Sequence, residues 1–99
     1  MMYIVTYDLN SPDKNYDELF ETLKTFPAYS KILKSTWLIA STEPVAVINH
    51  MLFPFLDKND SLFIARLYQD YNCYLPKTAI SWIKDCETKK LFGTNETSG

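Results

Sequence analysis

The sequence predicts a two-layer α/β sandwich of the α+β class, with an additional helix at its C-terminal end. Strand-like and helix-like segments alternate along the chain, a pattern typical of a sheet covered by helices. The chain has 99 residues, which corresponds to one domain. It is 46% hydrophobic and 15% aromatic. We expect part of this apolar surface to contact a partner subunit, because aromatic side chains are enriched in interface cores.

The first element expected is a strand over residues 2–9. Its side chains are apolar or weakly polar on both faces until Asp8, which predicts a central strand covered on both sides. Residues 10–13, Asn-Ser-Pro-Asp, predict a turn directly after it. Asp8 therefore lies at the C-terminal end of a central strand, a position where many proteins with mixed helices and strands keep their chemistry.

An amphipathic helix is expected next. Asn15 and Glu18 have the spacing of a capping box. Residues 16–23 repeat apolar side chains at helical spacing, and Pro27 limits the helix. Residues 29–41 are then expected to be extended, and propensity leaves open whether they form one strand or two.

A second helix follows this extended segment. Ser41 or Thr42 can cap it, and Pro44 falls in its first turn, where a missing N–H costs little. Its buried stripe is expected to contain Val45, Ile48, Leu52 and Phe55.

The last strand and the last helix complete the prediction. The strand is expected over residues 61–68, after the polar turn at residues 57–60. The helix opens near Pro76. We place the domain in residues 1–87 and a flexible polar tail in residues 88–99. The inner stripe of the helix is expected to contain Ala79, Ile80 and Ile83.

If residues 29–41 form two strands, the order of elements becomes β-α-β-β-α-β, which is the ferredoxin-like plan. The two internal helices then cover one face of the sheet. The other face needs a cover, and this can come from the C-terminal helix or from a second copy of the chain.

Charge and composition narrow the function. The formal net charge is −2 and Arg66 is the sole arginine, so tight, sequence-independent nucleic-acid binding by a monomer is not expected. A local basic patch, or one made by dimerisation, stays open. Cys73 and Cys86 lack metal-ligand spacing, and we expect reduced thiols in a cytoplasmic protein. No apolar run approaches the roughly 20 residues of a membrane span. His50 is expected to be a solvated side chain.

Three short segments resemble a known family. They are Tyr7-Asp8-Leu9, residues 34–38 (Lys-Ser-Thr-Trp-Leu) and residues 60–67 (Asp-Ser-Leu-Phe-Ile-Ala-Arg-Leu). Over about residues 2–85 the chain resembles the CRISPR-associated Cas-two family. It is most similar to the stand-alone SinR branch, which shares the ending Leu75-Pro76…Trp82. The toxin family VapD is a more distant relative by fold.

The resemblance implies a ferredoxin-like homodimer that forms through the uncovered face of the sheet. The aspartate that ends the first strand, here Asp8, would lie near the two-fold axis, where two copies can hold one divalent metal ion. Some members of the family cut RNA or DNA, and in others the fold is a non-catalytic scaffold for the adaptation integrase. This chain differs in its thin basic surface and in the helix near Pro76, which stands where the family has a swapped strand.

Asp8 is the candidate catalytic and metal-binding residue. Magnesium prefers hard oxygen ligands and keeps several waters, so carboxylates paired across a two-fold axis could hold Mg²⁺ or Mn²⁺ loosely. The ion could then activate water for attack on a phosphodiester. The alternative is that Asp8 caps the following turn through Asn10 or Ser11.

Ser35, Thr36 and Arg66 are the candidate nucleic-acid-binding residues. Antiparallel pairing of the two extended segments would bring both hydroxyls near Asp8, where they could orient a phosphate or a water. Alternatively, they satisfy backbone groups. Arg66 either grips phosphate or pairs with a carboxylate at the dimer face. Four aromatic residues could stack on bases, although packing is their expected role: Tyr3, Tyr7, Trp37 and Trp82.

The function expected from these features is a Cas-two-like, nucleic-acid-associated homodimer with metal-dependent endonuclease activity at paired Asp8 residues. The alternative is a non-catalytic module of the same fold that presents aromatic surface to a protein partner, and the sequence pI of about 5.2 favours it. A VapD-like toxin is a third option, which needs a ribonuclease site that the sequence does not display.

Overall fold

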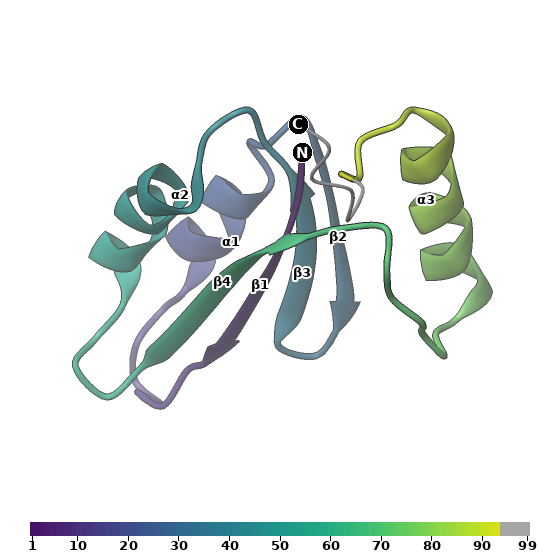
Figure 1. The fold of residues 1–99 in the computed structure, drawn as a ribbon. Helices are drawn as coiled ribbons and strands as arrows, with labels where there is room; N and C mark the ends of the chain where they lie inside the picture. Colours follow the sequence, from purple (N-terminus) through teal and green to yellow (C-terminus); the bar gives the residue numbers. More distant parts are fainter. Residues whose placement is uncertain (94–99) are drawn as a thin grey trace.

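The computed structural model describes residues 1–93 and has the α+β class expected from the sequence. Its elements are β1 (Met2–Asp8), α1 (Asp17–Leu23), β2 (Ala28–Leu33), β3 (Thr36–Ala40), α2 (Val45–Leu52), a 3₁₀ turn (Phe53–Phe55), β4 (Ser61–Leu67) and α3 (Lys77–Thr88). The helices α1 and α2 cover one face of a four-stranded sheet, and α3 lies against the opposite face (Figure 1). The sheet with α1 and α2 is a two-layer α/β sandwich, to which α3 is added.

The sheet has the strand order β2-β3-β1-β4, and all neighbouring strands are antiparallel. Residues 29–41 therefore contain parts of two strands joined by a short hairpin turn, which settles the alternative that propensity left open. Strand β1 lies inside the sheet, where Thr6 pairs with Thr36 of β3 and Asp8 pairs with Ser61 of β4. Strands β2 and β4 form the two edges.

The first core lies between the sheet and the helices α1 and α2. Successive side chains of a strand point to opposite faces, so the odd-numbered residues of β1 face these helices. Trp37 is 4% exposed, and its Nε1–H donates a hydrogen bond to the Tyr7 hydroxyl over 3.1 Å. Full burial of each large apolar side chain contributes about 1.5–3 kcal/mol. The buried members are Tyr3, Val5, Tyr7, Leu19, Leu23, Phe26, Trp37, Ile39, Ile48 and Leu52.

A second core lies on the opposite face, under α3. The helix buries Ala79, Ile83 and Cys86, which share one face at helical spacing. It covers the end of the sheet where Met2 pairs with Ala40. The buried members are Met2, Leu38, Ala40, Ile83, Cys86 and Phe92.

The opposite end of this face stays uncovered. Phe63 is 64% exposed and Leu33 is 54% exposed. Both lie at the end of the sheet where β1 ends, since Phe63 lies opposite Thr6 of β1 and Leu33 lies opposite Thr36, the residue of β3 that pairs with Thr6. One helix of 12 residues thus covers only part of the second face.

The end of α3 is a Schellman motif. Lys90 adopts the left-handed conformation with φ of 58°, and its N–H donates to the carbonyl of Glu87 over 2.9 Å. The N–H of Leu91 donates to the carbonyl of Cys86 over 3.0 Å. These are the two bonds that define the motif, and they reverse the chain toward the sheet.

The chain directly after α3 packs against the domain. Phe92 is 6% exposed in the second core, and Gly93 forms a parallel bridge with Tyr68. The flexible tail expected over residues 88–99 therefore does not begin at its first residue. The part of this expectation that concerns residues 94–99 lies outside the described residues.

Two local expectations differ from the structure. The Asn15 side chain accepts a hydrogen bond from the N–H of Asp17 over 2.8 Å, and it forms no capping box with Glu18. Val45, expected in the buried stripe of α2, is 40% exposed, whereas Ile48 is fully buried. Val45 is the first residue of its helix, and side chains tilt toward the helix N-terminus, so this one points past the core.

Candidate functional site

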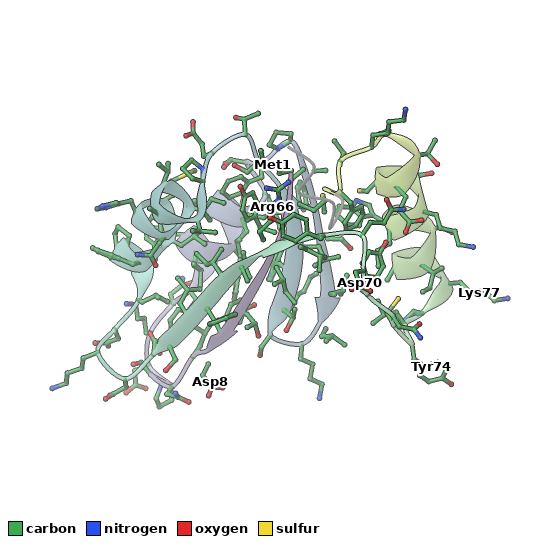
Figure 2. The ribbon with its side chains drawn as sticks, in the orientation of Figure 1. Met1, Asp8, Arg66, Asp70, Tyr74 and Lys77 are labelled. Atoms are coloured by element: carbon green, nitrogen blue, oxygen red, sulfur yellow. The ribbon has the colours of Figure 1, made fainter. Side chains whose placement is uncertain are left out.

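Asp8 is the last residue of β1 and lies at the far end of the sheet from Met1 and Arg66 (Figure 2). Its side chain is exposed, and we find no hydrogen bond or ion pair to its carboxylate among residues 1–93. The alternative role of Asp8 as a turn cap is therefore not seen. The neighbouring Asn10 N–H and Ser11 hydroxyl instead donate to other aspartates.

A shallow hollow adjoins Asp8. Its volume is about 300 Å³. Because Asp8 pairs with Ser61 and Thr6 pairs with Phe63, these four side chains lie on the same sheet face as α3, at the end that α3 leaves uncovered. Among the residues that line the hollow there is one carboxylate and no cationic side chain. They are Thr6, Tyr7, Asp8, Ser61, Leu62 and Phe63.

Ser35 and Thr36 lie at the same end of the sheet as Asp8. The Thr6 hydroxyl lies 3.1 Å from the Ser35 carbonyl oxygen and 3.0 Å from the Thr36 hydroxyl. The Ser35 carbonyl also accepts the Tyr7 N–H over 3.1 Å. These hydrogen bonds join β1 to the β2–β3 turn. They fit the alternative role of such hydroxyls, which is to bond backbone groups. Thr36 is 9% exposed, so little of it is available to a phosphate.

Arg66 is far from Asp8. It lies opposite Tyr3, five positions along β1, which corresponds to about 16 Å. Its guanidinium carbon lies 4.7 Å from the centre of the Tyr68 ring, and its buried Nε has no hydrogen-bond partner among residues 1–93. The structure therefore does not bring Arg66 together with the other candidate residues of the same chain.

A polar network beside Asp8 was missed by the sequence analysis. Asp60 accepts hydrogen bonds from the N–H groups of Asn10 and Asp57, both over 2.7 Å. It also accepts the Tyr16 hydroxyl, which lies 2.7 and 2.8 Å from its two oxygens. The network joins the loop after β1 to the turn before β4. Tyr16 and Asp60 lie 44 positions apart, and no local pattern in the sequence pairs them.

The groups around Asp60 favour its ionised form, which accepts these hydrogen bonds. Desolvation alone would raise the pKa of Asp60, but the N–H groups of Asn10 and Asp57, the Tyr16 hydroxyl and Lys14 together hold it below its usual value. Burial and the neighbouring Asp60 raise the pKa of Tyr16, so its hydroxyl remains a donor. Asp60 is thus ionised and has both oxygens engaged, and it is not free to join Asp8 as a metal ligand.

One chain does not fit a magnesium site. Within residues 1–93 no group of three or more His, Cys, Asp or Glu side chains is arranged to hold a metal ion. Asp8 offers one carboxylate, whereas Mg²⁺ takes an octahedral shell and is usually bound through one or two carboxylates with waters and substrate phosphates. A second carboxylate has to come from a second copy of the chain.

Comparison with known proteins adds no assignment. No family model matches the sequence, and no curated protein matches it. In the part of the chain that the structure describes, every helix is too short or too polar to cross a lipid bilayer. The geometry of the site is therefore the main guide to function.

Proposed function

We propose that this chain is a ferredoxin-like, Cas-two-like domain that forms a homodimer on RNA or DNA and hydrolyses phosphodiester bonds with Mg²⁺ or Mn²⁺ at paired Asp8 residues. The observation that carries the proposal is an exposed Asp8 carboxylate that ends β1 and has no hydrogen-bond donor among residues 1–93. The antiparallel order β2-β3-β1-β4 supports the ferredoxin-like plan. The free thiols of Cys73 and Cys86 support a reducing compartment, the cytoplasm.

The uncovered end of the sheet supports a second copy as the source of the second carboxylate. Phe63 and Leu33 expose apolar surface there, and Asp8 lies at the same end of the same face. Burial of exposed apolar side chains is a common driving force for association. A two-fold axis close to the end of β1 would bury Phe63 and place the two Asp8 residues near each other.

In this proposal the ion and the residues of the chain have different roles. A bound ion would supply an activated water and neutralise charge on the phosphate. The Asp8 carboxylate would hold the ion, and the exposed Ser61 opposite it places a hydroxyl at the rim of the hollow. Asp60 holds the adjacent loop in place through its bonds to Asn10 and Tyr16.

The second candidate function is a non-catalytic module that uses the same dimer to present a surface to a protein partner. The absence of cationic side chains around the described hollow favours it, because a phosphodiester carries negative charge. The net charge of −2 also favours the non-catalytic module, because a negatively charged chain does not attract nucleic acid over long distances.

The two candidates are separated by cleavage and metal binding. Wild type, Asp8→Ala and Asp8→Asn are incubated with single- and double-stranded RNA and DNA in Mg²⁺ or Mn²⁺, with and without EDTA. Asp8→Ala is expected to lower cleavage about 100-fold or more, because the metal contributes several kcal/mol of transition-state stabilisation. Calorimetry with Mn²⁺ is expected to show one ion per two chains, lost in both variants.

The matched control is Asp70→Ala, which removes an exposed aspartate far from Asp8 (Figure 2). This variant is expected to cleave and to bind Mn²⁺ like wild type. Equal cleavage by wild type and Asp8→Ala would assign the activity to a contaminant and overturn the nuclease proposal. A dimer without metal binding or cleavage would favour the non-catalytic module.

A further inference from the structure

A groove separate from the hollow beside Asp8 lies between α1 and β2. It is on the sheet face that α1 and α2 cover, at the opposite edge of the sheet from β4. Its volume is about 410 Å³, within the range of about 300–1,000 Å³ that is typical of ligand pockets. Phe20 stacks on Trp37 at 6.3 Å between ring centres, and Tyr29 tilts against Trp37 at 6.2 Å. Trp37 is buried and Tyr29 is 42% exposed, so a fixed aromatic wall presents an accessible ring.

The groove is cationic. Lys31 follows Tyr29 on the same face of β2, and its ammonium lies 5.6 Å from the centre of the Phe20 ring. Among residues 1–93, no carboxylate lines the groove and none lies within salt-bridge distance of Lys31. Lys24 also lines it, and its ion pair with Glu21 over 3.4 Å is weak because the two side chains are 47% and 72% exposed. The groove therefore favours an anionic ligand, unlike the hollow beside Asp8.

The edge of β2 is poorly suited to pairing with another strand. Lys31 stands in the middle of the strand, and the register is irregular between Lys31 and Leu33. Charged side chains and bulges are two features by which edge strands resist the addition of a strand. A flat ring that stacks on an aromatic side chain needs no regular ladder of backbone hydrogen bonds. A planar anionic ligand thus fits this groove better than an extended peptide.

We propose that this groove binds an unstacked nucleotide of a single-stranded nucleic acid, with the base on Tyr29 and the adjoining phosphates near Lys24 and Lys31. Aromatic stacking beside a cationic groove is the chemistry with which proteins hold single strands without sequence preference. The site lies on the opposite face of the sheet from Asp8. It goes beyond the hydrolysis proposed at Asp8, because it requires neither a metal ion nor a second copy of the chain.

Fluorescence anisotropy with labelled single-stranded RNA and DNA of about a dozen nucleotides tests the proposal at several salt concentrations, in EDTA to prevent cleavage. Tyr29→Leu is expected to raise Kd by about tenfold, because it removes a stacking ring but keeps an apolar side chain. Tyr29→Phe keeps the ring and is expected to change Kd by less than about twofold. Lys31→Gln is expected to weaken binding and to reduce the slope of log K against log salt by about 0.7, the value for one phosphate contact on a single strand.

The chain offers matched controls outside the groove. Tyr74 is fully exposed and Lys77 is exposed, so Tyr74→Leu and Lys77→Gln repeat the two changes elsewhere (Figure 2). Both controls are expected to bind like wild type. Thermal unfolding of each variant shows that the fold is kept. Because binding is measured in EDTA, without the metal ion that hydrolysis requires, a failure of this site is distinguishable from a failure of the hydrolysis proposal.

Four results would overturn the nucleotide site. They are the absence of binding at low salt, equal weakening by the control variants, equally tight binding of a duplex or of inorganic polyphosphate, and displacement by polyglutamate at the same charge concentration. Loss of the dimer in light scattering of Tyr29→Leu would instead identify a second copy of the chain as the occupant.

Discussion

At the scale of single residues, two aspartates close to the end of β1 have different roles because different donors surround them. Asp8 ends β1, and Asp60 immediately precedes the residue that pairs with it. Asp60 accepts two backbone N–H bonds and the Tyr16 hydroxyl, whereas Asp8 accepts none that the structure describes. The surrounding donors therefore assign Asp60 to stability and leave Asp8 available for binding.

Asp60→Asn is expected to lower the midpoint of thermal unfolding at neutral pH. The variant has one acceptor oxygen where the carboxylate offers two, so an N–H of Asn10 or Asp57 loses its partner. The folded pKa of Asp60 is lowered, so its contribution is present above the unfolded pKa of about 3.9 and is lost as pH falls through the folded pKa. The stability difference from wild type should therefore narrow below about pH 4.

The control for this prediction is Asp70→Asn, which changes an exposed aspartate for which the structure shows no bond through its side chain among residues 1–93. It should leave the unfolding midpoint nearly unchanged at every pH. A difference between Asp60→Asn and wild type that stays constant from neutral pH to pH 2 would contradict the proposed role of the ionised carboxylate.

At the scale of elements, the Schellman motif decides how much of the second face is covered. The motif reverses the chain after α3, and Phe92 then enters the second core. It requires a left-handed residue, and Lys90 fills this position although glycine is the residue that adopts it without strain. The C-terminal end of α3 therefore carries a local strain that a substitution can relieve.

Lys90→Gly is expected to stabilise the protein by about 1 kcal/mol, because a residue with Cβ costs about 1–2 kcal/mol in the left-handed region and glycine loses part of this gain as chain entropy. Urea denaturation measures the change. Lys89→Gly is the matched control, since Lys89 has φ of −79°, and glycine there should destabilise by about 0.5–1 kcal/mol. Equal effects of the two substitutions would contradict the role of the left-handed conformation.

At the scale of the whole molecule, the two faces of the sheet are covered unequally. Two helices cover one face, and α3 covers only one end of the other. The uncovered end carries Phe63, which is 64% exposed, together with Asp8. The proposed dimer interface and the proposed metal site therefore share one surface.

Phe63→Lys is expected to abolish the dimer while it changes the stability of the monomer by less than about 0.5 kcal/mol, the usual effect of a surface substitution. A lysine on each copy would place like charges in the proposed interface. Light scattering at micromolar concentration measures the mass, and urea denaturation measures the stability. Tyr74→Lys, at another exposed aromatic residue, should leave the mass unchanged; a wild-type protein that remains a monomer at this concentration would contradict the dimer.

Much of the fold was predictable from local patterns. The short apolar runs of β1 and β4 beside polar turns and the helical spacing in α1 and α3 predicted these elements close to their observed bounds. The division of residues 29–41 was not predictable, because both halves have strand propensity and only pairing with β1 shows where the turn lies. The exposure of Val45 and the packing of Phe92 also depend on which surfaces meet in three dimensions.

The candidate site was predictable in part. The position of Asp8 follows from its place at the end of an apolar strand-like run, and Ser35 and Thr36 lie at the same end as antiparallel pairing requires. The distance of Arg66 from Asp8 is a consequence of register, which a single sequence does not reveal. The bond between Tyr16 and Asp60 joins residues 44 positions apart, beyond the reach of any local pattern.

The sequence by itself determined where most strands and helices form, because the spacing of apolar side chains within a few residues follows from the geometry of a strand or a helix. Only the tertiary structure decided which carboxylate is engaged and which is open, which half of the second face α3 covers, and which rings and lysines meet between α1 and β2. These depend on register and on contacts between distant segments, and such contacts form only when the whole chain buries its apolar surface at once.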